Sequence, residues 1–222
     1  MLNLDHIVIS AESLLVGQEF IEDKLGVKAD PGGEHPVFGT HNKLISFGDT
    51  YLEIIAVSPE LVPERVPRWF NLDNFTGEPR ITNWVCSTSF SKIVPNDLMH
   101  GMGEILNLSR GSLTWNITVP DDGQLPYEGF APALIDWGGS EHPTQTLKDK
   151  GIRLKKFIIK HKSATNLRSS FSGLLSDQRI EFRSTPGAGS YELWIETPQN
   201  KTVAIKKYSA MHLPRRLRLL ST

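Results

Sequence analysis

The chain has 222 residues, of which 39% are hydrophobic and 22% are charged, and its formal net charge is −1. This composition excludes a long disordered chain and a nucleic-acid binder that relies on overall positive charge. The length suits one large domain or two small ones, and either can bury a substantial core.

Membrane and secretion signals are missing from the sequence. The longest apolar runs, such as residues 7–9 and 54–57, fall far short of the roughly 20 residues that span a bilayer. The first six residues have neither a basic region nor a long apolar stretch, so we expect a cytoplasmic protein without a signal peptide. The single cysteine, Cys86, lies in a strand-like segment, and a buried, inert thiol is favoured over a nucleophile.

The first 57 residues predict the order β-α-(β)-β-β. Residues 4–9 are rich in β-branched side chains and indicate a strand that ends at Ser10, which then offers a helix N-cap. Apolar residues recur at helical spacing over residues 11–25. Residues 43–47 and 51–56 flank a short glycine-containing connection, which is typical of a hairpin.

The same order begins twice more along the chain. Residues 58–79 carry four prolines and are interpreted as a connecting loop that packs its aromatic side chains on the fold. We then expect a strand at 81–87, a helix at 96–105, and strands at 113–119 and 131–137. A third copy comprises a strand at 154–160, a helix at 163–175, and strands at 179–184, 191–196 and 202–206.

This self-similarity predicts an α+β protein of repeated modules that pack through shared sheets. We expect one domain over residues 1–207, with modules at about 1–57, 80–138 and 154–207. Residues 208–222 form a basic tail that carries Arg215, Arg216 and Arg218 among leucines. A solvated or docked tail is favoured over a nucleic-acid or membrane patch.

Two polar residues interrupt apolar strand faces. Alternate side chains of a strand share a face, so His6 lies with Leu4 and Val8, and Glu53 lies with Tyr51 and Ile55. A buried carboxylate needs a partner or a cation. If the two strands are neighbours, the pair could bind zinc, nickel, manganese or iron(II), and simple hydrogen bonding between the two side chains is the alternative.

His41 opens the preceding strand and is a candidate third ligand or acid/base group. Its face also carries Lys43 and Ile45, so a structural role in its own loop is the alternative.

Six further residues are candidates for substrate contacts or for structural roles. Arg110 could pair with an anionic substrate or form a surface salt bridge. Asp136 could orient a substrate group or cap the turn that follows it. Trp69 and Trp115 could form an apolar wall, or belong to the core. For His142, as for His161, a hydrogen bond within a loop is favoured.

Several segments resemble the glyoxalase-like family within the vicinal oxygen chelate superfamily. They are Leu4-Asp5-His6-Ile7-Val8 and Tyr51-Leu52-Glu53-Ile54-Ile55, together with residues 35–42, 109–115, 134–138 and 142–143. The resemblance implies curved mixed sheets of βαβββ modules around a cavity. It also implies a metal held by a His on the first strand and a Glu on the last strand of each module, and His6 and Glu53 match those places.

The later modules depart from the family's ligand pattern. Asn83 stands where the second His is expected, and Leu134 or Asp136 falls near the second acid. In the third copy, Lys156 and Leu193 occupy the matching places. The ion is therefore held by His6, Glu53 and an additional ligand such as His41 or Asp136, or the cavity binds an organic ligand without metal.

The leading hypothesis is a small-molecule enzyme in which a metal at His6 and Glu53 polarises adjacent oxygens of the substrate while His41 moves a proton. Isomerisation, lyase chemistry and ring-opening oxygenation all remain open. The rival hypothesis is a metal-free protein of the same fold that sequesters a hydrophobic or aromatic compound. A homodimer paired through sheet edges is compatible with either.

Overall fold

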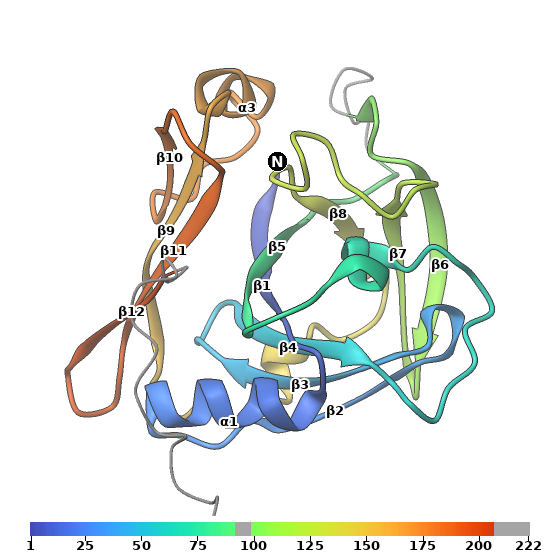
Figure 1. Ribbon diagram of the computed structural model, residues 1–222, viewed down its shortest axis with the longest axis horizontal. Coiled ribbons are helices and arrows are strands. Elements are labelled where there is room, and N and C mark those ends of the chain that lie inside the picture. Colours follow the sequence, from blue (N-terminus) through green and yellow to red (C-terminus); the bar gives the residue numbers. More distant parts are fainter. Residues whose placement is uncertain (92–98, 207–222) are drawn as a thin grey trace, which may run out of the picture.

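Two β-sheets and the helices packed on them make up the computed structural model, which describes residues 1–91 and 99–206 (Figure 1). The helices are α1 (Leu14–Leu25) and α3 (Ala164–Ser170), and the short 3-10 turns are η1 (Pro36–Phe38), η2 (Trp69–Asn74) and η3 (Pro143–Gln145). The strands are β1 (Asn3–Ser10), β2 (Asp30–His35), β3 (Thr40–Ser46), β4 (Tyr51–Val57), β5 (Arg80–Ser87), β6 (Glu104–Arg110), β7 (Leu113–Val119), β8 (Ala133–Asp136), β9 (Arg153–His161), β10 (Ile180–Ser184), β11 (Ser190–Glu196) and β12 (Thr202–Lys206).

The larger sheet has eight strands in the order β2-β3-β4-β1-β5-β8-β7-β6. Its halves repeat one pattern, because β1 pairs in parallel with β4 as β5 pairs in parallel with β8, and β1 and β5 meet antiparallel. The sheet curls so that its two edge strands approach each other, and a Cβ atom at Gly33 of β2 would lie 2.6 Å from the Arg110 side chain of β6. The expected α+β fold with a curved mixed sheet is confirmed.

Helix α1 covers the outer face of the first half. It begins after Ser13, whose hydroxyl accepts a hydrogen bond from the Val16 amide, rather than after Ser10 as predicted. Gly26 ends it in the left-handed conformation, with φ 67°. Gly17 lets the helix approach the sheet closely, because a Cβ atom there would lie 2.7 Å from Ile54.

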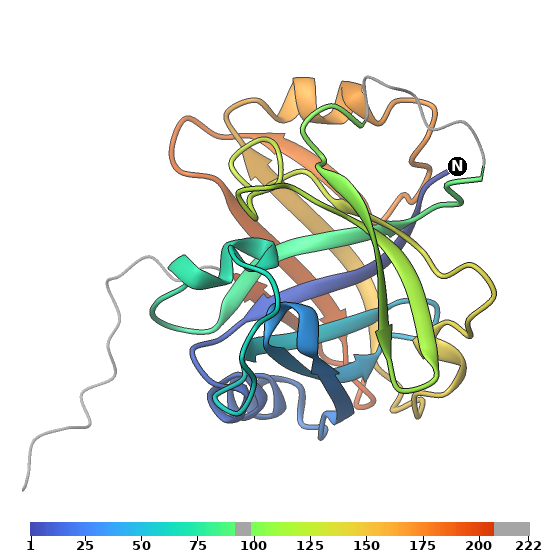
Figure 2. The ribbon, with the colours of Figure 1, turned by 90° about the vertical axis from the view of Figure 1, so that its right-hand side faces the viewer.

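The smaller sheet has the order β10-β9-β11-β12 and stands beside the curved sheet (Figures 1 and 2). In this segment the first strand, β9, pairs with β10 and β11. In the larger sheet, the first strand of each half pairs with the last strand of that half, β1 with β4 and β5 with β8. The third segment therefore does not repeat the strand order of the other two. Trp84 joins the sheets, since its ring packs against Phe157, Phe171 and Phe182.

Some predicted elements differ from the structure. The helix expected at 96–105 conflicts with β6, which begins at Glu104, and residues 96–98 lie outside the described part of the chain. The helix expected at 163–175 ends at Ser170. The basic tail at 208–222 also lies outside the described residues. No helix within the described ranges is long and apolar enough to cross a membrane.

Candidate functional site

The registers of three neighbouring strands bring the predicted polar residues to one face. Val8 lies beside Glu53 in the parallel pair β1/β4, so His6 and Glu53 point to the same side of the sheet. Ile55 of β4 lies opposite Asn42 of β3, which places the Asn42 amide on that side as well. This side is the concave face of the curved sheet.

These side chains line a small cavity, which we call the polar cavity. Its polar lining residues are His6, His35, Asn42, Glu53 and Arg110, and its aromatic walls are Tyr51, Trp69, Phe70, Trp115 and Trp137. Its volume is about 30 Å³, which holds roughly two water-sized groups. A substrate therefore enters with only its reacting end unless a side chain moves.

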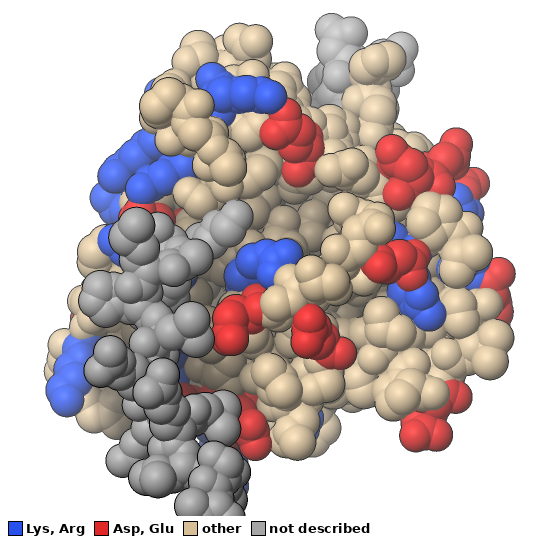
Figure 3. All heavy atoms as spheres, in the orientation of Figure 1, with Lys and Arg blue, Asp and Glu red and all other residues tan. Residues whose placement is uncertain are grey.

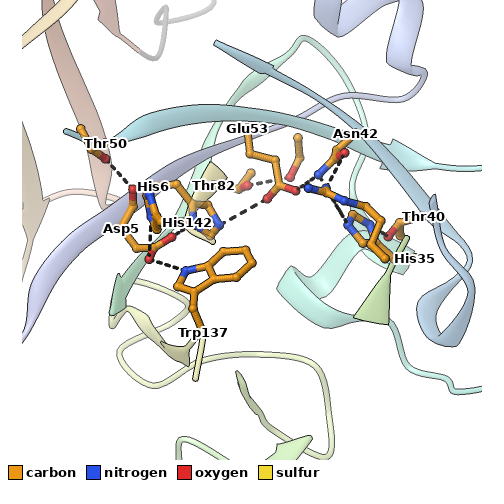
Figure 4. A network of polar contacts seen from close by, with 12 residues as sticks. Asp5, His6, His35, Thr40, Asn42, Thr50, Glu53, Thr82, Trp137 and His142 are labelled. Atoms are coloured by element: carbon orange, nitrogen blue, oxygen red, sulfur yellow. Dashed lines mark hydrogen bonds and ion pairs between the residues drawn. The ribbon is translucent and has the colours of Figure 1, made fainter. Parts of the chain in front are cut away.

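A continuous series of contacts crosses the polar cavity (Figure 4). His6 Nε2 and Glu53 Oε2 are 3.5 Å apart. The other Glu53 oxygen accepts a hydrogen bond of 2.5 Å from the Asn42 amide nitrogen, and the Asn42 carbonyl oxygen accepts one of 3.0 Å from Arg110. Arg110, on the far edge strand β6, is thereby coupled to the carboxylate on β4.

Asp5 supports His6 from behind. Its Oδ1 lies 2.7 Å from His6 Nδ1, and its Oδ2 accepts a 2.8 Å hydrogen bond from Trp137 and lies 3.2 Å from His142 Nε2. Strict alternation along β1 would turn Asp5 away from His6, but the register between β1 and β5 shifts between Leu4 and His6. Such a bulge re-aims side chains and brings the acid and the imidazole together.

The pair of His6 and Glu53 is held in its charged form. Burial lowers the pKa of His6, but hydrogen bonds and charges from Asp5 and Glu53 outweigh it and raise this pKa to about 9. Burial raises the pKa of Glu53, but the hydrogen bond and charge of His6, with His35 and Asn42, together lower it to about 2. The cavity therefore contains an imidazolium, a guanidinium and a carboxylate.

His35 is a polar residue of this cavity that was not among the candidate site residues from the sequence. Its Nδ1 lies 3.1 Å from Thr40 Oγ1, and its Nε2 lies 3.5 Å from both the Asn42 amide and the Arg110 guanidinium. Burial, together with the charge of Arg110, lowers its pKa to about 4, so the ring is neutral. The only signal in the sequence was its place in one of the family-like segments.

The structure gathers five of the seven predicted site residues in the polar cavity. They are His6, Glu53, Arg110, Trp69 and Trp115. His41 is not among the residues that line it, because it faces the opposite side of β3 from Asn42 and lies beside Glu34 of β2. Asp136 is not there either, since its carboxylate accepts hydrogen bonds from the Phe90 and Gly138 amides and caps the turn.

At the positions that match His6 and Glu53, the second half of the curved sheet carries neither an imidazole nor a carboxylate. His6 pairs with Val85 and Val8 pairs with Asn83, so exchanging β1 and β5 puts Asn83 in the place of His6. Val8 lies beside Glu53 and Val85 lies beside Ala133, so Ala133 takes the place of Glu53. The register thus corrects the expectation of Leu134 or Asp136 at the second acid position.

The donors present do not fit a resident divalent ion well. His6 Nε2 and Glu53 Oε2 are suitable ligands, and Asp5 holds the far nitrogen of the imidazole as carboxylates often do behind metal-bound histidines. Within residues 1–91 and 99–206, however, no group of three His, Cys, Asp or Glu residues is placed to hold a metal. Arg110 adds a fixed positive charge to the same cavity.

Comparisons with known proteins agree with this fold. A family model described as a glyoxalase-like domain matches residues 4–175. A hypothetical protein from Staphylococcus aureus has a solved structure with TM-score 0.58 and 18% identity, over 93% of this chain and 86% of that one. A variant of methylmalonyl-CoA epimerase from Streptomyces coelicolor, in complex with 2-nitronate-propionyl-CoA, has TM-score 0.42 and 19% identity, over 64% and 99%. No curated protein matches the chain.

Proposed function

Because this chain belongs to the glyoxalase-like domain family, we propose that it is a small-molecule enzyme that moves a proton on an organic acid bound in the polar cavity. The reaction class is isomerisation or lyase chemistry. The observation that carries the proposal is the convergence of the His6–Glu53 pair, Asn42 and Arg110 in one buried cavity with aromatic walls.

Hydrogen-bond donors in the cavity suit an anionic substrate. Arg110 offers a planar fork that matches a carboxylate. The indole nitrogen of Trp69 is buried without a hydrogen-bond partner among the described residues, so a ligand oxygen would satisfy it. Both groups bind and orient the acid end of the substrate.

Glu53 and His6 would carry the proton transfer. Their side chains are 3.5 Å apart, which is too long for a strong hydrogen bond, so each keeps hydrogen-bonding capacity for a reacting group that lies against both. Glu53 accepts a proton from the carbon next to a carbonyl group. His6 donates a hydrogen bond to the carbonyl oxygen, where negative charge develops.

Neither the proton transfer to Glu53 nor the hydrogen bond from His6 needs a metal ion. The proposed mechanism uses none, because the side chains of the polar cavity are a poor match for a divalent ion. The polar side chains of the cavity include an acid group and a base group, which suit proton transfer. The proposal is therefore limited to proton transfer.

The test is hydrogen–deuterium exchange at the carbon next to the carbonyl, followed by NMR in D2O over a panel of 2-oxo acids from pyruvate to phenylpyruvate. We expect Glu53→Gln to slow exchange by about a hundredfold or more. The matched control is His41→Ala, which alters the same sheet on the opposite face and should leave exchange unchanged.

Three outcomes separate the alternatives. Equal exchange in wild type and Glu53→Gln would overturn the proposal. Loss of exchange in His41→Ala alone would instead favour His41 as the acid/base group. Tight binding of these acids with no exchange in any variant would favour the sequestering protein.

A further inference from the structure

A second cavity of about 230 Å³ lies beside the polar cavity, and we call it the side cavity. It is lined by the first residues of β5, the loop after β7 and strands β11 and β12, with Asn83, Phe130 and Tyr191 among its walls. Figure 3 shows this face of the molecule hollowed between the two sheets. Phe70 lines both cavities, so its ring stands between a large space and a small one.

Asn83 is the polar group of the side cavity that calls for a ligand. The side chain is 3% exposed, and it hydrogen bonds to nothing in the part of the chain that the structure describes. Its amide faces the cavity, and its nitrogen and oxygen together match another amide or a hydroxyl group. Asn83 is the counterpart of His6 in the second half of the curved sheet.

The charged groups around the side cavity already have partners. Arg80 donates to the Thr76 carbonyl oxygen at 2.8 Å, and Lys206 lies 3.4 Å from a carboxylate oxygen of Glu192. Glu128 pairs with Lys162 at 2.5 Å. Among the described lining residues no negative charge is therefore left unpaired for a cationic ligand, and Arg80, bonded to neutral carbonyl oxygens, suits the oxygen of a polar neutral group.

The remaining walls are flat and aromatic. Phe130 stacks on Tyr191 with ring centres 4.7 Å apart, and Phe75 lies under the Arg80 guanidinium at 4.2 Å. Since these ring faces are covered, the rings offer mainly their edges to the cavity, and an aromatic edge packs well against the face of a planar ring. Together with Asn83 they favour a planar group that carries a carboxamide or a similar neutral hydrogen-bonding function.

The backbone at Phe70 is strained. Phe70 and Asn71 both have φ 55°, a left-handed conformation that residues other than glycine seldom adopt. Two such residues in succession occur where surrounding structure imposes them, often in segments that switch on ligand binding.

We propose that the side cavity binds a planar, uncharged, amide-bearing part of the substrate, and that Phe70 moves aside so that one ligand spans the side cavity and the polar cavity. The first part of this proposal, the amide site, depends on the side cavity alone. The second part, a ligand that spans both cavities, rests on the proposed function, because it places the acid end of the same ligand beside Arg110.

Benzamide tests the first half, since it combines a flat ring with a carboxamide and has no charge. We expect it to bind the full chain in ligand-observed NMR titrations, and Asn83→Leu to weaken its binding by about fivefold or more. Asn107→Leu, at an exposed asparagine of β6, is the matched control and should bind benzamide as wild type does. Thermal melting of each variant confirms that it folds.

Acetate and hippurate test the second half. Acetate probes the polar cavity alone, and hippurate joins a benzamide group to a carboxylate. Hippurate should displace both benzamide and acetate. Phe70→Gly removes the ring and accepts the positive φ, so it should bind hippurate more tightly. Asn71→Gly relieves the neighbouring strain but keeps the Phe70 ring, and it should show a smaller gain or none.

The outcomes are distinguishable. Absence of benzamide binding, or equal binding by wild type and Asn83→Leu, would overturn the amide site. Hippurate that displaces benzamide but not acetate, in wild type and in Phe70→Gly, would overturn the spanning ligand. Benzamide binding with no acetate binding would count against the proposed function and leave the amide site in place.

Discussion

Among single residues, the charged state of His6, Glu53 and His35 gives the protein a defined stability maximum. Glu53 has a folded pKa of about 2, below its usual 4.5, so its contribution is present above pH 4.5 and is lost as pH falls toward 2. His35 is buried neutral with a pKa of about 4, so folding becomes less favourable as pH falls from 6.5 toward 4. His6 has a pKa of about 9, so its contribution is full below pH 6.5 and is lost as pH rises toward 9.

We therefore expect the free energy of unfolding to peak near pH 6.5. It should fall by roughly 2–3 kcal/mol between that pH and the alkaline side of pH 9. Urea unfolding followed by circular dichroism at each pH measures this. His6→Gln should flatten the alkaline decline, and His41→Gln should keep it. An unchanged alkaline decline in His6→Gln would show that another group causes it.

Metal content is the second prediction at this scale. Because the cavity offers two suitable ligands beside a guanidinium, we expect protein purified without chelators to hold clearly less than one divalent ion per chain. Elemental analysis before and after incubation with zinc, nickel or manganese measures it, with the His6→Ala/Glu53→Gln double variant as the blank. One bound ion per chain in wild type and none in the double variant would restore the metal site that the sequence predicted.

At the scale of whole elements, the positions of the strands were easier to predict from the sequence than the side chains that meet in the polar cavity. The period-two pattern of β1 and β4 was enough to place His6 and Glu53 on one face. It could not place Asp5, whose position depends on a bulge, or Arg110, which arrives from the far edge strand because the sheet curls. It also misread the segment around Glu104, where a helix was expected and an edge strand stands.

Closure of the curved sheet at β2 and β6 leads to a further prediction. Gly33 makes room for Arg110, because a Cβ atom there would lie 2.6 Å from Arg110 Cδ. We expect Gly33→Ala to push the guanidinium out of the polar cavity and to weaken acetate binding by about fivefold or more without changing any charge. NMR titration with acetate measures the effect.

Gly139→Ala is the control, since a Cβ atom there meets nothing within 4 Å. It should bind acetate as wild type does. Equal binding by Gly33→Ala and Gly139→Ala would mean that Arg110 is not what holds the anion.

Over the whole molecule, the side cavity exists because the four-stranded sheet stands beside the curved one. The join between them is aromatic. Trp84 is fully buried, packs against Phe157, Phe171 and Phe182, and donates a 2.9 Å hydrogen bond to the Phe130 carbonyl oxygen. One residue of β5 thus ties the wall that carries Asn83 to the wall that carries Tyr191.

We expect Trp84→Ala to lower the free energy of unfolding by about 3–5 kcal/mol, because it removes a large buried ring and leaves a carbonyl oxygen unsatisfied. It should also abolish benzamide binding while sparing acetate, since none of the residues that line the polar cavity belongs to the four-stranded sheet. Trp194→Ala, at a half-buried tryptophan of β11 beneath Lys206, should cost less and leave both probes bound. If Trp84→Ala kept its affinity for benzamide, the side cavity would not depend on how the two sheets pack.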